Sequence, residues 1–153
     1  MNVRKYETRL NENGFVMLNL VFSKYIPEIE NNFSNSEKIY QLCCTLKWDR
    51  FSEEHVFLLS VDMKYRLKAF FEIGNNDTCL VDRRGIAQKI LLSNAAKMIM
   101  VHNHPSGDPT PSKEDLNVSN ELKKLGELLD IPFVDSIILG DGIYISFMEK
   151  GIL

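Results

Sequence analysis

The chain has 153 residues, of which 44% are hydrophobic and 25% charged, and its net charge is −3. This length and composition indicate one soluble globular domain with its own core. A mildly acidic chain is not built to coat nucleic acid, although a local basic patch is compatible with this charge.

The three cysteines, Cys43, Cys44 and Cys79, form no CxxC pair, which argues against a disulfide framework and against a cysteine zinc site. Reduced thiols fit a cytoplasmic protein. The N-terminus contains no apolar h-region of a signal peptide, and the apolar runs are shorter than the ~18 residues that a membrane span needs. We therefore expect a cytoplasmic protein without a membrane segment.

The first part of the chain predicts one strand and one helix. Residues 1–13 are polar and charged, and we expect them to be poorly ordered. Residues 15–22 are apolar and aromatic and predict a strand, which pairs either within the sheet or across a dimer. Residues 23–35 predict a loop or linker. Ser36 is the predicted N-cap of a helix with apolar residues at 39, 42, 43 and 46.

The rest of the chain alternates strands and helices. Strands are predicted at 54–62, 67–74, 78–81, 96–103, 134–139 and 143–147, and helices at 83–94 and 112–130. Residues 63–66 and 140–142 predict the turns of two hairpins. The helix at 112–130 has apolar residues at 116, 118, 122, 125, 128 and 129, and Pro132 ends it. This alternation predicts an α/β fold, with helices flanking a mixed sheet.

Residues 101–115, VHNHPSGDPTPSKED, contain a group of metal-binding side chains. His102 and His104 end a predicted strand and share one of its faces, whereas Asn103 points to the other face. Asp115 lies in the first turn of the next helix. Two imidazoles and a carboxylate are three corners of a tetrahedral zinc site, with bonds of about 2.0–2.1 Å. The fourth corner is then free for a water whose pKa falls toward ~7, which predicts a catalytic site.

Each of these residues also has a simpler explanation. Asp115 favours the positive N-terminus of a helix, and Ser112 fits an N-cap because Ser-x-x-Asp resembles a capping box. A single histidine in a strand is more often a surface or core residue than a ligand. Two histidines at i and i+2 favour the metal site, because the simpler explanations do not require them together. Ser112 could both cap the helix and steady a metal-bound water.

A hydrolase also needs a general base. The histidine that remains is His55, so a carboxylate is expected, and Glu53 and Glu54 stand at the start of a core strand. Adjacent strand residues face opposite sides, so at most one of them reaches the metal. An acid at a strand end is usually only solvated, and the sequence pattern does not choose between the two.

The spacing of His102, His104, Ser112 and Asp115 matches the JAMM motif of the JAB/MPN metalloprotease superfamily: H-x-H, seven residues, S, two residues, D. The segment VHNHPSGDPTPSKEDL resembles the corresponding segment of the RadC-like proteins, once called DNA repair proteins. RRGIAQKILLSNAAKMI, EEHVFLLSVDMKYRL and YISFMEKGIL also resemble segments of that family. The resemblance covers residues 36–153, so residues 1–35 are expected to form an N-terminal strand and linker segment.

The resemblance implies the MPN/JAB fold, layered like cytidine deaminase, with one zinc ion per chain bound by His102, His104 and Asp115. It implies that Ser112 orients water or stabilises an oxyanion. It also favours Glu54 as the general base, with His55 facing away. The implied activity is a zinc-dependent hydrolase, a metalloprotease or isopeptidase acting on a peptide or protein. The alternatives are a DNA repair-associated protein, with nucleic acid as partner, and a non-enzymatic interaction module.

Two departures from the family pattern bear on function. Family members often carry Asp-His where this chain has Asp135-Ser136, so any role of that histidine in substrate handling would be missing. Full-length RadC proteins usually have an N-terminal helix-hairpin-helix-like region, and residues 1–35 contain no Gly-rich hairpin pair. Autonomous DNA binding is therefore not expected. The sequence leaves open the oligomeric state and the bond that is cleaved.

Overall fold

The computed structural model describes residues 1–75 and 82–153. The strands are β1 (Asn2–Leu10), β2 (Val16–Tyr25), β3 (His55–Val61), β4 (Leu67–Asn75), β5 (Lys97–Asn103), β6 (Phe133–Leu139) and β7 (Tyr144–Ser146). The helices are α1 (Ser36–Thr45), α2 (Arg83–Leu92) and α3 (Lys113–Leu129), with a 3-10 turn η1 (Trp48–Arg50). The strand predicted at 78–81 lies outside the described residues.

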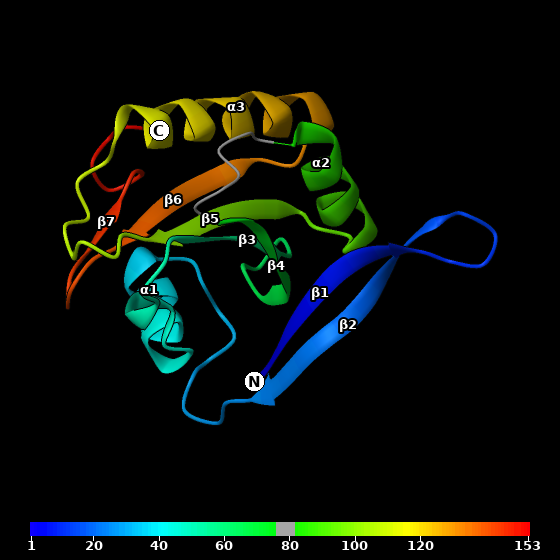
Figure 1. Cartoon of the computed structure of the whole chain (residues 1–153), viewed down its shortest axis with the longest axis horizontal. Helices are drawn as coiled ribbons and strands as arrows, with labels where there is room; N and C mark the ends of the chain where they lie inside the picture. Colours follow the sequence, from blue (N-terminus) through cyan, green and yellow to red (C-terminus); the bar gives the residue numbers. More distant parts are fainter. Residues whose placement is uncertain (76–81) are drawn as a thin grey trace.

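The described strands form one seven-stranded sheet in the order β2-β1-β4-β3-β5-β6-β7. β1 and β4 are parallel, as are β5 and β6, and the other neighbours are antiparallel. Helices α2 and α3 cover one face of the sheet and α1 covers the other (Figure 1). The predicted mixed sheet flanked by helices is therefore confirmed. None of the described helices is long and apolar enough to cross a membrane.

Two hydrophobic layers lie on the two faces of the sheet. Leu59 and Val101 pack on the side of α1, whereas Leu58 and Met100 pack on the side of α3. Successive strand residues point to opposite faces, so a strand covered by helices on both sides is apolar throughout. Full burial of each such side chain stabilises the fold by about 1.5–3 kcal/mol. The buried apolar run of β5 thus supports His102 near the end of the strand and His104 just after it.

The expectation that residues 1–13 are poorly ordered is wrong. β1 pairs with β2 along its whole length and meets β4 at the pair Lys5↔Phe70. Val3 is fully buried in the α1-side layer, and the polar side chains of β1 are accommodated because most of the strand is partly exposed. The intervening turn is closed by Asn11, whose Oδ1 accepts hydrogen bonds from the backbone N–H groups of Asn13 and Phe15. Backbone pairing thus orders a segment of polar composition.

Two element ends also differ from the sequence prediction. β2 continues to Tyr25, so the loop predicted from residue 23 begins after it. The N-cap of α1 is Asn35, whose side chain accepts from the backbone N–H of Lys38 at 2.9 Å, and not Ser36. The Ser36 hydroxyl instead hydrogen-bonds to Tyr144 and Glu149.

The predicted helix at 112–130 is confirmed as α3, but its buried face differs. Leu116 and Leu128, predicted on the apolar face, are 41% and 81% exposed. The buried positions are Asp115, Ser119, Leu122, Leu125 and Gly126. The polar members of this face lie at the N-terminal end of the helix, where the predicted metal ligand is. The positions of the apolar residues therefore did not predict the buried face of α3, because this helix also buries the polar residues Asp115 and Ser119.

Candidate metal centre

Four side chains from three separate segments meet where β5 ends and α3 begins. Glu54 precedes β3, His102 is the second-last residue of β5, His104 follows that strand, and Asp115 is in the first turn of α3. The candidate ligand atoms of these residues all lie within 4.8 Å of one another. His102 and Asp115 are buried, whereas Glu54 and His104 are partly buried.

The structure places the two candidate bases differently. Glu54 joins the cluster, whereas Glu53 is exposed. His55 is directed to the opposite face of β3, where its Nδ1 hydrogen-bonds to Glu72 Oε1 at 2.6 Å. This alternation is what a strand imposes on successive residues. Of the sequence candidates, the geometry therefore brings together the three predicted ligands and Glu54.

The loop between β5 and α3 is held against the β6–β7 turn. The His104 N–H donates to Leu139 O at 2.9 Å, and the Asp141 N–H donates to Gly107 O at 2.9 Å. A Cβ at Gly140 would lie 2.4 Å from Gly107 O, so this close approach requires glycine. The loop runs from the end of β5 to the start of α3 (Figure 1). It brings Asp115, in the first turn of α3, to His102, with Oδ1 and Nε2 3.0 Å apart.

Ser112 and Asp115 form a capping box at the start of α3. The Ser112 N–H and hydroxyl each donate to Asp115 Oδ2 at 2.7 Å, and the Asp115 N–H donates to Ser112 Oγ at 3.1 Å. The simpler explanation of both residues, a helix cap, is therefore confirmed. It does not exclude a ligand role, because the other oxygen, Asp115 Oδ1, lies 3.0 Å from His102 Nε2.

His104 is held in one orientation by a backbone carbonyl. Its Nδ1 lies 2.8 Å from Asp108 O, and because a carbonyl only accepts, Nδ1 carries the hydrogen. Nε2 of the neutral ring then presents its lone pair to the cluster, where His102 Nε2 is 3.1 Å away. Such an outer contact is usual for a metal-binding histidine.

The charges of the cluster are coupled. The hydrogen bond with Asp115 raises the pKa of His104, and burial opposes this. Burial would raise the pKa of Asp115, but the His102 and His104 rings, which in their protonated form donate to its carboxylate, outweigh burial and hold that pKa well below its usual range. The cluster therefore keeps an ionised carboxylate facing two imidazoles, which favours a bound cation, whether a proton or a metal ion.

The donor set fits a zinc ion. The distances from His102 Nε2 to Asp115 Oδ1 and to His104 Nε2 are 3.0 and 3.1 Å, and His104 Nε2 to Asp115 Oδ2 is 3.5 Å. Ligands at zinc-bond lengths on a tetrahedron are about 3.3 Å apart. Nε2 is the nitrogen of His102 that faces the cluster. The buried Nδ1 of His102 has no hydrogen-bond partner among the described residues, in contrast to Nδ1 of His104. Nitrogen and carboxylate donors are also those that zinc prefers.

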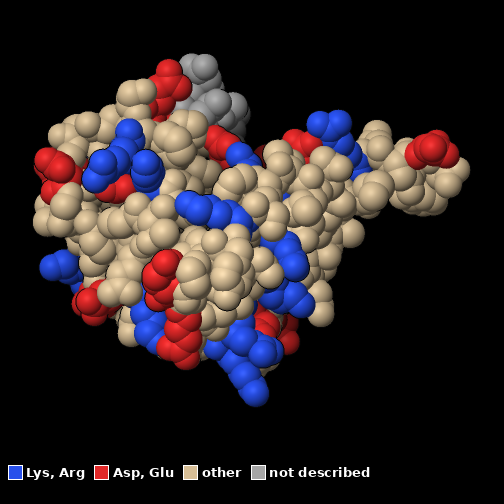
Figure 2. Space-filling view, turned by 90° about the horizontal axis from the view of Figure 1, so that it is seen from below, with Lys and Arg blue, Asp and Glu red and all other residues tan. Residues whose placement is uncertain are grey.

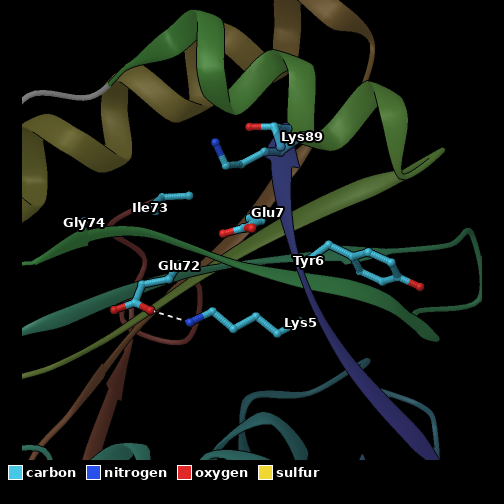
Figure 3. A pocket seen from close by; sticks show the side chains of 8 residues that line it. Lys5, Tyr6, Glu7, Glu72, Ile73, Gly74 and Lys89 are labelled. Atoms are coloured by element: carbon cyan, nitrogen blue, oxygen red, sulfur yellow. Dashed lines mark hydrogen bonds and ion pairs between the residues drawn. The ribbon is translucent and has the colours of Figure 1, made fainter. Parts of the chain in front are cut away.

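A hollow lies apart from this cluster and is bordered by β1, β4 and α2. It has a volume of about 370 Å³ and is lined by Lys5, Tyr6, Glu7, Thr8, Glu72, Ile73, Gly74 and Lys89. Lys5 and Glu72, 2.5 Å apart, form an ion pair at its edge, and Lys89 reaches in from α2 (Figure 3). None of the four cluster residues lines it. The hollow is therefore not the candidate metal centre.

Charges on the surface are mixed. On the face shown in Figure 2, Lys and Arg side chains are interspersed with Asp and Glu. This distribution agrees with the net charge of −3. Nucleic-acid-binding surfaces usually gather basic side chains into a patch or stripe. Among the described residues, the face in Figure 2 shows no such basic patch or stripe.

The fold and the site together define a class of protein. A mixed sheet flanked by helices, with two histidines at a strand end and an aspartate at the next helix start, is consistent with the JAB/MPN fold. The model of the RadC-like JAB domain family matches residues 33–152. The chain belongs to this family.

Several curated relatives are similar to this chain. The UPF0758 protein of Clostridium kluyveri is 47% identical over 104 residues, which cover 66% of this chain and 45% of the relative. The UPF0758 protein of Clostridium tetani is 40% identical, covering 80% of this chain and 54% of the relative. That of Thermotoga maritima is 35% identical, covering 82% and 57%. The chain thus spans about half the length of the curated relatives it matches.

One structurally important residue of the site had no role in the sequence interpretation. Asn103 is 2% exposed, and its side chain hydrogen-bonds to the segment that carries Glu54. The available signal was a polar residue at the inner face of a buried strand, between two candidate ligands. The Asp108 carbonyl that orients His104 leaves no such signal, because every residue has a carbonyl.

Proposed function

We propose that this RadC-like protein is a zinc-dependent hydrolase that cleaves peptide or isopeptide bonds. The observation that carries the proposal is the spacing of the donors of His102, His104 and Asp115, with Glu54 beside them. Three protein ligands and an open position are typical of catalytic zinc sites, whereas structural sites use four protein ligands.

The three ligands would hold one zinc ion per chain through the two Nε2 atoms and the Asp115 carboxylate. A bound zinc ion supplies a Lewis acid for the scissile carbonyl and a water with a pKa near ~7. The ligands are set in advance, because β5 is buried on both faces and Asp108 and Ser112 orient His104 and Asp115. Such preorganisation avoids rearrangement during the reaction.

Glu54 is the proposed general base. Its carboxylate lies within 4.8 Å of the ligand atoms, so it can accept a proton from the attacking water and pass it to the leaving amine. Ser112 is the proposed donor to the developing oxyanion. Its hydroxyl donates to Asp115 Oδ2 in this structure, so it must rotate toward the substrate to act. In other enzymes such a donor is worth ~3–4 kcal/mol.

The test compares two neighbouring glutamates. Zinc-loaded protein is assayed against peptide, isopeptide and other amide substrates, with Asp115→Ala as the blank. We expect Glu54→Gln to lose hydrolysis while keeping its zinc, and the matched control Glu53→Gln to keep both. Full activity of Glu54→Gln would show that the base is misassigned. Failure of the wild type to cleave any of these substrates would contradict the proposed function.

A second candidate, a non-enzymatic interaction module, is favoured by β2. This strand ends the sheet, and Met17, Leu20 and Val21 on it are 46%, 51% and 51% exposed. An apolar edge strand is a template for pairing with another chain. If β2 pairs with another chain, Leu20→Lys should weaken the association of the two chains in sedimentation experiments. Asp115→Ala should leave this association unchanged. The opposite pattern would exclude this candidate.

A further inference from the structure

Asn103 stands between the two candidate zinc ligands in sequence but points away from them. Its side chain crosses to the segment before β3 and makes three hydrogen bonds to backbone groups. Oδ1 accepts from the His55 N–H at 2.9 Å, and Nδ2 donates to Glu53 O at 2.9 Å and to Phe51 O at 3.4 Å. The residue is 2% exposed, so these contacts are shielded from water.

These bonds surround the candidate base. The Glu53 carbonyl belongs to the peptide group before Glu54, and the His55 N–H belongs to the peptide group after it. Because each peptide group is planar, holding both of them fixes the two backbone torsions of Glu54. Asn103 therefore holds Glu54 at its backbone, although the two side chains lie on different faces.

The position of this contact is also informative. The backbone pairing of β3 with β5 ends at Val56↔His102, so Glu54 lies outside the paired part of the two strands. The side-chain amide of Asn103 replaces the missing ladder, since it offers one donor and one acceptor as a peptide group does.

We propose that Asn103 is a positioning residue, which couples the zinc-binding end of β5 to the placement of the Glu54 carboxylate. The inference rests on the proposed role of Glu54 as general base. Asn103 keeps this carboxylate within reach of the proton it accepts. A misplacement of about 1 Å in an active site can cost roughly 100-fold in rate.

A purely structural role would also satisfy the buried backbone groups, so the test needs a matched control. Asn31 provides one, because its side-chain amide holds a backbone in the same manner. Its Oδ1 accepts from the Leu67 N–H at 2.7 Å, and its Nδ2 donates to Leu67 O at 3.5 Å. Asn31→Ala therefore removes a comparable clamp without touching the Glu54 segment.

The first readout does not depend on hydrolysis. Protein with ¹³C-labelled glutamate is loaded with Co²⁺, and the paramagnetic broadening of the Glu54 carboxyl signal reports its distance from the metal. We expect strong broadening in the wild type and in Asn31→Ala, and clearly weaker broadening in Asn103→Ala at equal metal content. The backbone N–H of His55 should also exchange with solvent faster in Asn103→Ala than in the wild type, because it loses its acceptor. Equal broadening in Asn103→Ala would overturn the proposal, even if no substrate is ever found.

The second readout is kinetic and applies once a substrate is cleaved. We expect Asn103→Ala to lower kcat roughly 10- to 100-fold with a smaller change in KM, and Glu54→Gln to cost much less in that background. Additive effects of the two substitutions would overturn the coupling. If Asn103→Ala does not fold, Asn103→Asp is measured instead. It fills the same volume and keeps the acceptor for His55, but it loses the donor to Glu53.

Discussion

Asp115 uses its two carboxylate oxygens for different contacts. Oδ2 accepts from the N–H and hydroxyl of Ser112, and Oδ1 faces His102 Nε2. The helix cap and the candidate metal site are therefore one arrangement. The helix dipole stabilises the ionised form of a carboxylate at a helix N-terminus, and the ionised form is the one that can act as a metal ligand.

Removal of the Ser112 hydroxyl separates its two proposed roles. Ser112→Ala loses the cap and should destabilise the protein by about 0.5–2 kcal/mol in urea unfolding. If the hydroxyl also stabilises an oxyanion, kcat should fall by roughly 100- to 1,000-fold, with one zinc ion still bound. A loss of stability with unchanged kcat would reduce Ser112 to a capping residue.

Glu72 predicts a pH dependence of stability. Burial would raise its pKa, but hydrogen bonds from Lys5 and His55 outweigh this and lower the pKa from its usual 4.5. The stabilisation is therefore present above about pH 4.5 and is lost as the pH falls through the lower, folded-state pKa. Thermal melting of Glu72→Gln should differ most from wild type near neutral pH and converge with it in acid.

The control for this experiment is an exposed ion pair. Glu30 is 74% exposed and pairs with Lys38 at 3.1 Å. Exposed pairs contribute little, so Glu30→Gln should match the wild type at every pH. A constant offset of Glu72→Gln down to strong acid would show that its charge is not the cause.

At the scale of elements, α3 depends on a close approach to the sheet. A Cβ at Gly126 would lie 2.7 Å from Ile131 O and 2.9 Å from Phe133 N. Alanine gains up to ~1 kcal/mol of helix propensity, but these backbone atoms cannot give way. We expect Gly126→Ala to lower the free energy of unfolding by about 1–3 kcal/mol in urea titrations.

An exposed position on the same helix provides the comparison. Asn120 is exposed, so Asn120→Ala should change the stability by at most about 0.5 kcal/mol. If Gly126→Ala proves as stable as Asn120→Ala, the contact between α3 and the following strand is looser than described.

The elements that the sequence predicted well are those with a strong local pattern. The hairpin of β3 and β4 and the strand β5 have apolar runs bounded by turn residues, and α3 has an N-terminal capping signal. β1 was missed because its order comes from pairing with β2, which composition does not reveal. The exposed Leu116 and Leu128 were misplaced because Asp115 and Ser119 occupy the buried face of α3.

The same distinction applies to the site. The positions of the candidate ligands follow from short-range spacing, since two strand residues share a face and a helix begins after a loop. The choice of Glu54 over Glu53 depends on strand alternation and on contact with a segment 48 residues later in the chain, which the resemblance supplied and composition did not. The role of Asn103 is a contact between side chain and distant backbone, which has no pattern in the sequence.

For the whole molecule, the continuous sheet predicts cooperative unfolding. Val3 of β1 is buried in the same layer as Trp48, which stacks on Phe57 with ring centroids 4.0 Å apart. We expect Trp48 fluorescence, which reports this layer, and far-UV circular dichroism to give coincident urea transitions. Separate transitions would indicate that residues 1–35 and residues 36–153 unfold independently. That result would fit the expected division of the chain near residue 36.

The central claim is that His102, His104 and Asp115 bind zinc, and metal stoichiometry after dialysis against trace zinc measures it most directly. The wild type should retain one zinc ion per chain, and His104→Ala and Asp115→Ala should retain little. His55→Ala is the matched histidine control, because His55 contacts Glu72 on the other face, and it should bind zinc as the wild type does. A wild type without zinc, or a His104→Ala variant with an unchanged zinc content, would contradict the account.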